Sequence, residues 1–146
     1  MFKQITVFLE NKPGRLEEVT GYLADSGINL HALSIADTTD FGVLRMIVSD
    51  PAKAKAALKA KNLMVQTTDV VAMPMGHTPG SLHRVLRKLE ALDLSIEYMY
   101  AFTGRLKDYD AVVILRLANQ EAALAKLKES GITILGQELI DRLNEA

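Results

Sequence analysis

The residues best suited to bind a ligand lie in a turn that occurs twice in the sequence. Asn11-Lys12-Pro13-Gly14-Arg15-Leu16 recurs as His77-Thr78-Pro79-Gly80-Ser81-Leu82. Each turn separates a strand pattern from a helix pattern. At the start of a helix, free backbone N–H groups and the positive end of the helix dipole face outwards together, and they attract carboxylates and other small anions. The repeated turn therefore predicts an anion-binding loop in each half of the chain.

Two asparagines favour a ligand at the first turn. Asn11 offers an amide that both donates and accepts hydrogen bonds, and Gly14 allows the backbone to approach a ligand closely. Asn29, at the start of the neighbouring strand, is expected to bring a second amide to the same end of the sheet. A structural interpretation stays open, in which Pro13 starts a helix, Asn11 caps it and Asn29 is only a turn residue.

Other kinds of site are absent from the sequence, so we expect a protein without catalytic activity, cofactor or metal. The three histidines lack partners at metal-ligand spacing, and the sequence contains no cysteine. No glycine-rich phosphate loop and no Gly-x-Ser-x-Gly element occurs. Asp37 with Asp40, and Asp108 with Asp110, lie in expected hairpin turns, where aspartate is favoured for backbone reasons.

Charge and hydropathy argue against nucleic acids and membranes as partners. The net charge is −1 at pH 7, so no strong field attracts a polyanion. RNA-recognition domains share the order of elements expected here, but they stack bases on aromatic residues where this chain has Val43 and Met46. The sequence shows neither a signal-peptide core nor an apolar run of ~18 residues. It therefore predicts a cytoplasmic protein.

The repetition extends beyond the turn and predicts two copies of one β-α-β-β-α-β unit. In the helix that follows each turn, for example, Leu23 corresponds to Leu89. Crossovers in this order give a four-stranded antiparallel sheet with both helices on one face, the ferredoxin-like arrangement of the α+β class. We expect one unit at residues 1–69 and the other at 70–146, coupled as a rigid body because no flexible linker separates them.

Hydrophobic periodicity places the elements within each unit. The first copy is expected to have a strand from Gln4, a helix from Pro13 to the stop at Gly27, strands at 28–36 and 42–49, a helix from Pro51 and a strand from Met64. The second is expected to have strands at 70–75, 94–102, 111–117 and 132–135, and helices at 80–92, 120–130 and 137–143. Several strands are apolar on both sides, which predicts that the second sheet face is covered by the other copy or by a second subunit, most simply in a homodimer.

The Pro-Gly turn, the Gly-Ile-Asn element and the tandem repeat together resemble the ACT domain family. The stretches that carry the resemblance are residues 9–16, 23–30, 78–82 and 94–96. The whole chain is similar to stand-alone tandem ACT proteins, whose second copy has a run like residues 97–102. The resemblance implies a ferredoxin-like module that binds an amino acid between two ACT units, held by the Pro-Gly loop of one unit and a strand of its neighbour.

The resemblance also implies which residues bind the amino acid. In serine-sensing dehydrogenases of the family, asparagines at the positions of Asn11 and Asn29 hold the ligand, whereas the second copy here has His77 and Ser95. Tyr98 and Tyr100 either line a pocket for a larger side chain or belong to the core. The ligand-binding residues predicted across the two copies are Asn11, Lys12, Pro13, Gly14, Arg15, Leu16, Asn29, Leu30, His77, Thr78, Pro79, Gly80, Ser81, Leu82, Ser95, Tyr98 and Tyr100.

We therefore expect an amino-acid-binding regulatory or sensor protein that lacks catalytic activity and controls a metabolic enzyme. The alternative is a regulatory or structural subunit that binds such an enzyme and has no small-molecule ligand of its own. The two copies are not expected to be equivalent, because His77 and Ser95 form a weaker, partly pH-dependent set; an imidazole titrates near neutrality.

Overall fold

The computed structural model describes residues 1–37, 40–104 and 106–146. Its contacts divide the chain into two compact units. The first unit is Lys3–Thr68, and the second is Met1–Phe2 together with Asp69–Ala146. The middle of the hairpin turn expected at positions 37–40 lies outside the described residues.

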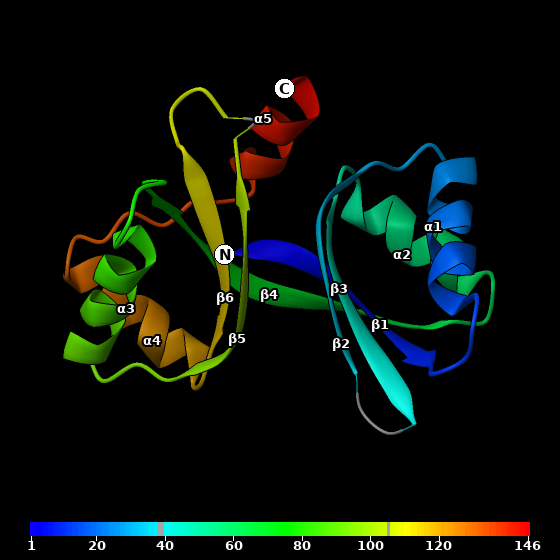
Figure 1. Ribbon diagram of the computed structural model, residues 1–146, viewed down its shortest axis with the longest axis horizontal. Coiled ribbons are helices and arrows are strands. Elements are labelled where there is room, and N and C mark those ends of the chain that lie inside the picture. Colours follow the sequence, from blue (N-terminus) through cyan, green and yellow to red (C-terminus); the bar gives the residue numbers. More distant parts are fainter. Residues whose placement is uncertain (38–39, 105) are drawn as a thin grey trace. The chain divides into compact units, whose positions relative to one another are not determined.

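The first unit has the element order expected from its sequence. Its elements are β1 (Phe2–Glu10), α1 (Arg15–Asp25), β2 (Leu30–Asp37), β3 (Phe41–Val48), α2 (Pro51–Lys59) and the beginning of β4 (Met64–Met75). The strands lie in the order β2-β3-β1-β4, and β3 pairs antiparallel with both β1 and β2. Figure 1 shows α1 and α2 together on one face of this sheet. The ferredoxin-like arrangement is confirmed.

Alternation along β1 builds the core of the first unit. Ile5, Val7 and Leu9 face the helices and are at most 3% exposed, where they pack with Leu23 of α1 and Leu58 of α2. Burial of such side chains is the main stabilising contribution to the fold, at about 25 cal/mol for each Å² of apolar surface removed from water. The core therefore fixes the end of β1, and with it the start of the loop that follows.

The opposite side of β1 is buried as well, although its residues are polar. Gln4 and Thr6 are 0% and 6% exposed. The Gln4 side-chain amide donates to the Thr6 hydroxyl at 3.0 Å, and that hydroxyl lies 3.0 Å from the Thr68 hydroxyl on β4. Hydrogen bonds of this kind offset the cost of burying polar atoms. The strand is consequently more buried than the half-buried strand expected from alternation.

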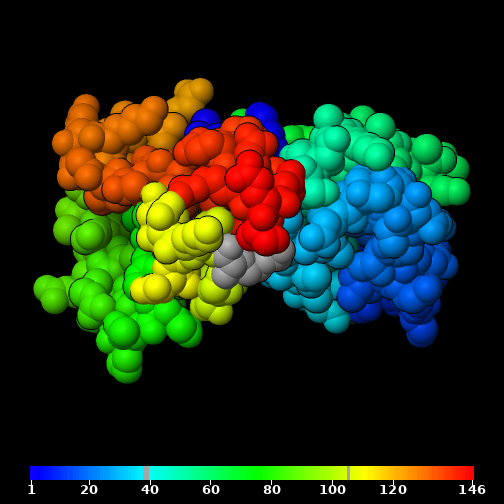
Figure 2. Space-filling model, turned by 90° about the horizontal axis from the view of Figure 1, so that it is seen from above, coloured from blue at the N-terminus to red at the C-terminus, as the bar shows by residue number. Residues whose placement is uncertain are grey.

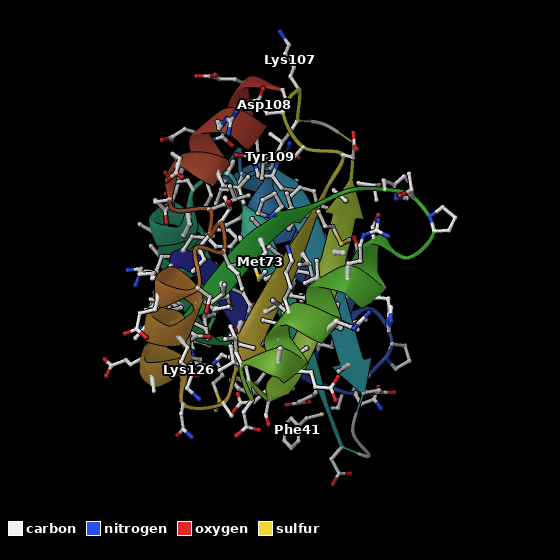
Figure 3. The ribbon with its side chains drawn as sticks, turned by 90° about the vertical axis from the view of Figure 1, so that its left-hand side faces the viewer. Phe41, Met73, Lys107, Asp108, Tyr109 and Lys126 are labelled. Carbon is white, nitrogen blue, oxygen red and sulfur yellow. The ribbon has the colours of Figure 1, made fainter. Side chains whose placement is uncertain are left out.

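The second unit repeats the order with the remainder of β4. It continues with α3 (Ser81–Ala91), β5 (Ile96–Thr103), β6 (Ala111–Leu117), α4 (Gln120–Glu129) and α5 (Glu138–Glu145). β6 pairs antiparallel with β4 and β5. Met73 of β4, labelled in Figure 3 between α3 and α4, is 3% exposed in the core of this unit. Phe2 is 0% exposed, and the sulfur of Met1 accepts a hydrogen bond from the Gln120 amide at 3.2 Å.

One strand expected in the second unit does not form. From the predicted strand 132–135 only Leu135 pairs with β4, through its N–H donating to the Ala72 carbonyl at 2.8 Å. The next N–H, of Gly136, instead donates to the Glu138 carboxylate at 2.9 Å as α5 begins. The chain turns into α5 directly after this single bridge, so the strand prediction is wrong for residues 132–135.

The final helix, α5, contacts the loop between β5 and β6. Arg142 of α5 forms an ion pair with Asp108, and its guanidinium carbon lies 5.4 Å from the centre of the Tyr109 ring. Figure 2 shows α5, in red, against this loop, in yellow. The side chain of Lys107, in the same loop, points away from α5 in Figure 3. Among residues 1–37, 40–104 and 106–146, no helix is long and apolar enough to cross a bilayer.

Candidate functional site

Both Pro-Gly loops are type II turns that lead directly into a helix. In the first loop the Arg15 N–H donates to the Lys12 carbonyl at 3.4 Å, and in the second the Ser81 N–H donates to the Thr78 carbonyl at 3.0 Å. The glycine of each loop has φ of 85° or 89° and ψ near zero. The third position of a type II turn requires this left-handed conformation, which glycine adopts without strain.

This geometry corrects the roles expected of Pro13 and Asn11. α1 begins at Arg15 with Gly14 as its N-cap, so Pro13 belongs to the turn and is not the first helical residue. No side chain caps α1, and the Asn11 backbone N–H donates to the Asp40 carbonyl at 3.1 Å. The Asn11 side chain is exposed. The capping interpretation is therefore wrong, and the amide faces solvent beside the helix start.

The first loop carries a cluster of opposite charges. Lys12 Nζ lies 2.8 Å from a Glu10 carboxylate oxygen, and an Arg15 guanidinium nitrogen lies 3.7 Å from the same oxygen. A second nitrogen of Arg15 contacts Glu18 at 3.0 Å. The hydrogen bond from Lys12, and then the charges of Lys12 and Arg15, lower the pKa of Glu10. Glu18 raises the pKa of Arg15. The loop thus holds an ionised carboxylate and a guanidinium side by side at the surface.

The second loop carries hydroxyl groups in place of these charges. The Ser81 hydroxyl is buried, accepts from the Thr78 backbone N–H at 3.1 Å and from the Arg84 guanidinium at 3.2 Å, and lies 3.1 Å from the Thr78 hydroxyl. His77 is exposed and lines a separate pocket of about 510 Å³ with Tyr109. The polar groups of this loop are therefore largely occupied with one another.

The structure separates Asn29 from Asn11. The first loop leaves the sheet at the end where β3 begins, whereas Leu30, which follows Asn29, pairs with Val48 at the other end of β3. The Asn29 N–H donates to the Ser49 hydroxyl at 2.9 Å. The expectation that both amides reach the same end of the sheet is therefore wrong. Strands β1 and β2 run in the same direction, so α1 must carry the chain back to the far end before β2 starts.

The corresponding residues of the second unit are separated in the same way. Ser95 lies just before β5, where its carbonyl accepts from the Ala118 N–H at 2.9 Å, and so lies at the opposite end of the sheet from His77. Tyr98 and Tyr100 are half-buried on β5, in register with residues of β6 that face away from the helices. Their side chains are thus not part of the helix-side core.

A pocket of about 590 Å³ opens next to the first loop. Its lining is Phe8, Leu9, Glu10, Arg15, Phe41, Lys61, Asn62, Leu63 and Met64. Of these only Arg15 was predicted as a site residue. Phe41 and Met64 are 53% and 66% exposed, and Figure 3 shows Phe41 at the end of the sheet. Apolar residues at the first position of β3 and of β4 were the available signal, but their approach to the loop depends on the fold.

The structure thus keeps residues 11–16 together in the loop of the first unit and residues 77–82 together in the loop of the second. The other predicted site residues lie away from these loops: Asn29, Leu30, Ser95, Tyr98 and Tyr100. Leu16 and Leu82 are each 38% exposed at the first turn of their helices. In the described part of the chain, no group of three histidine or carboxylate side chains is arranged to hold a metal ion.

Comparison with known proteins identifies the family. The sequence model of the family described as the ACT domain pair matches residues 1–143 of this chain. Protein BT0572 from Bacteroides thetaiotaomicron is 47% identical, with a TM-score of 0.80 over 91% of this chain and 90% of that one. The ligand-free regulatory subunit of aspartate kinase from Thermus thermophilus is 17% identical, with a TM-score of 0.56 over 87% and 91%. The Thermus flavus subunit has the same identity and TM-score, over 87% and 90%.

No curated protein matches the chain. The Thermus structures, at their low identity, support the fold alone. The family model spans nearly the whole sequence. In both units of this chain, the Pro-Gly loop lies between the first strand and the first helix. This protein belongs to the family of ACT domain pairs.

Proposed function

We propose that the protein is a cytoplasmic regulatory module, without catalytic activity of its own, that binds an amino acid and controls a metabolic enzyme. The observation that carries the proposal is the first Pro-Gly loop, where the exposed Asn11 amide, the start of α1 and the Arg15 guanidinium lie together. These groups suit an α-carboxylate. The Thermus relatives, described as regulatory subunits of aspartate kinase, supply a precedent for an enzyme as partner.

We further propose that the site is completed by a second copy of the chain. Asn29 lies at the far end of its own sheet, so a neighbouring copy in the opposite direction would bring its Asn29 to this loop. The edge strand β2 offers a surface for such a contact, because Leu33 and Ile35 are 47% and 50% exposed. Adjacent exposed apolar side chains of this kind favour association.

Mixing two variants tests this arrangement directly. Asn11→Ala and Asn29→Ala chains, each defective alone, are refolded together and titrated with the twenty amino acids by calorimetry. In a two-fold dimer half of the molecules are mixed, and each mixed dimer has one site with both asparagines, so about a quarter of the wild-type binding capacity returns. If no capacity for tight binding returns although Asn11→Ala alone weakens binding, Asn29 of a second copy is not part of the site.

The alternative is an interaction subunit without a small-molecule ligand. The same exposed side chains of Leu33 and Ile35 favour it, since an enzyme surface would cover them as well as a second copy. Flat titrations with all twenty amino acids, together with a stable complex with a metabolic enzyme that Leu33→Ser disrupts, would favour this alternative.

A further inference from the structure

We propose that the pocket beside the first Pro-Gly loop selects amino acids with a large apolar side chain. This inference rests on the proposed function, because it names the class of amino acid that the loop would bind. In this arrangement Arg15 binds the α-carboxylate, Glu10 binds the α-ammonium group, and the side chain enters the pocket.

Two of the three charged residues that line the pocket match the charges of an amino acid, and the third, Lys61, has its ammonium group 5.2 Å from the centre of the Tyr22 ring. Glu10 and Arg15 both line it, and the closest distance between their charged atoms is 3.7 Å, longer than a tight ion pair. The partners they have in the structure are exposed, and exposed ion pairs contribute little stability, so a ligand replaces them at low cost. Glu10 has a pKa below its ordinary value and is therefore a carboxylate at neutral pH, ready to accept from an ammonium group.

The walls of the pocket are predominantly apolar. The apolar lining residues are Phe8, Leu9, Phe41, Leu63 and Met64. Phe41 and Met64 are among the most exposed large apolar side chains of the described residues. A volume of about 590 Å³ lies within the ~300–1,000 Å³ range of small-molecule sites. An aromatic or long aliphatic side chain would cover apolar surface that is otherwise in water, whereas a small or charged side chain would not.

The second unit lacks this combination of groups. In the repeat, Gly76 stands where the first copy has Glu10, and Ser81 stands where it has Arg15. The pocket of about 440 Å³ beside the turn after α4 has Lys88 as its one charged lining residue in the described part of the chain. We therefore expect one such amino acid for each chain.

Calorimetric titration of the full chain tests the proposal. Phenylalanine, leucine and methionine are expected to bind more tightly than glycine, serine and aspartate. Phe41→Ala and Met64→Ala should each weaken phenylalanine binding roughly five- to tenfold, because each removes apolar contact area. The matched controls are Asp110→Ala and Thr133→Ala, which change the corresponding positions of the second copy and should leave the affinity unchanged.

Two analogues test the roles of the charges. Wild-type protein should prefer phenylalanine to 3-phenylpropanoate, which has no ammonium group, and Glu10→Gln should remove that preference. Arg15→Gln should in the same way remove the preference for phenylalanine over 2-phenylethylamine, which has no carboxylate. Folding of every variant is checked by circular dichroism.

The outcomes separate this inference from the proposed function. Tight binding of glycine or serine that depends on Asn11 but not on Phe41 or Met64 would overturn the inference and leave the proposed function standing. Selective binding of large apolar amino acids that changes no enzyme partner would support the inference and count against the regulatory role. The absence of binding by any amino acid would overturn both.

Discussion

The two Pro-Gly loops share one backbone and differ in where their polar groups point. The first loop presents Glu10, Lys12 and Arg15 to solvent, in exposed pairs that a ligand can replace. The second directs the guanidinium of Arg84 onto the buried hydroxyl of Ser81, so its polar groups bind one another. A duplicated turn thus repeats a helix start without repeating the side-chain chemistry, because the backbone geometry depends on proline and glycine and the chemistry on their neighbours.

The largest expected effect concerns ligand affinity at the first loop. Asn11→Ala should weaken amino-acid binding by about ten- to a hundredfold, since buried polar atoms of the ligand would lose their partner. The melting temperature should stay the same, because Asn11 does not cap α1. His77→Ala, at the corresponding position of the second loop, serves as the control and should change this affinity far less. Equal losses in both variants would remove the distinction between the loops.

The glycines should be equally important for stability in both loops. Gly14→Ala and Gly80→Ala place a side chain at φ of 85° and 89°, which costs about 1–2 kcal/mol in the free energy of unfolding. A new Cβ at Gly80 would also lie 3.0 Å from an Arg84 nitrogen, a flexible end that must move aside, whereas Gly14 has open space. Urea denaturation measures both.

Gly21→Ala provides the control for these glycine variants. This residue lies within α1, has no atom within 4 Å of a built Cβ and does not have a positive φ. Alanine there should stabilise the protein by about 0.5–1 kcal/mol. A stabilising effect of alanine at Gly14 or Gly80 as well would show that the turns are not of type II.

A smaller effect should separate the loops through their side chains. Ser81→Ala removes the buried acceptor of the Thr78 N–H and should destabilise the protein by about 1 kcal/mol in urea denaturation. Arg15→Ala, whose ion pairs are exposed, should leave the urea midpoint unchanged. A reversal of this order would contradict the assignment of an internal network to the second loop.

The smallest expected effect is the pH dependence of stability. The pKa of Glu10 is lowered in the folded protein, so its stabilising contribution is present above the ordinary value of 4.5 and is lost as the pH falls through the lowered value. Glu10→Gln should therefore make the melting temperature less sensitive to pH between about pH 5 and pH 3. The second loop has Gly76 at this position and therefore has no corresponding carboxylate. An unchanged pH profile in Glu10→Gln would show that Lys12 and Arg15 do not stabilise the carboxylate.

The sequence predicts the order of elements well because the relevant signals are local. The period of apolar residues identifies α1 and β1, and Gly27 ends α1 through its left-handed φ of 70°. The position of Asn29 relative to Asn11 could not be predicted in this way, because it depends on the direction in which β2 runs along β3. That register is a property of paired strands, and no single stretch of residues encodes it.

The failed strand and the pocket both depend on contacts between distant parts of the chain. The segment 132–135 has a strand-like pattern, yet only Leu135 pairs with β4 before α5 begins. The pocket likewise depends on Phe41 and Met64 meeting Arg15 from distant parts of the chain. Non-local contacts of this kind decide sites more often than they decide helices, which is why the loop itself was predicted and its pocket was not.

The burial of Phe2 limits how the protein can be dissected. Because Met1 and Phe2 belong to the second unit, a fragment that begins at Asp69 would lack a fully buried aromatic ring and the sulfur that accepts from Gln120. Loss of a buried phenylalanine side chain typically costs about 3–5 kcal/mol, a large part of the stability of a small domain. Separate study of the second unit thus calls for a short peptide with the sequence of the first residues, supplied in trans or joined through a designed linker.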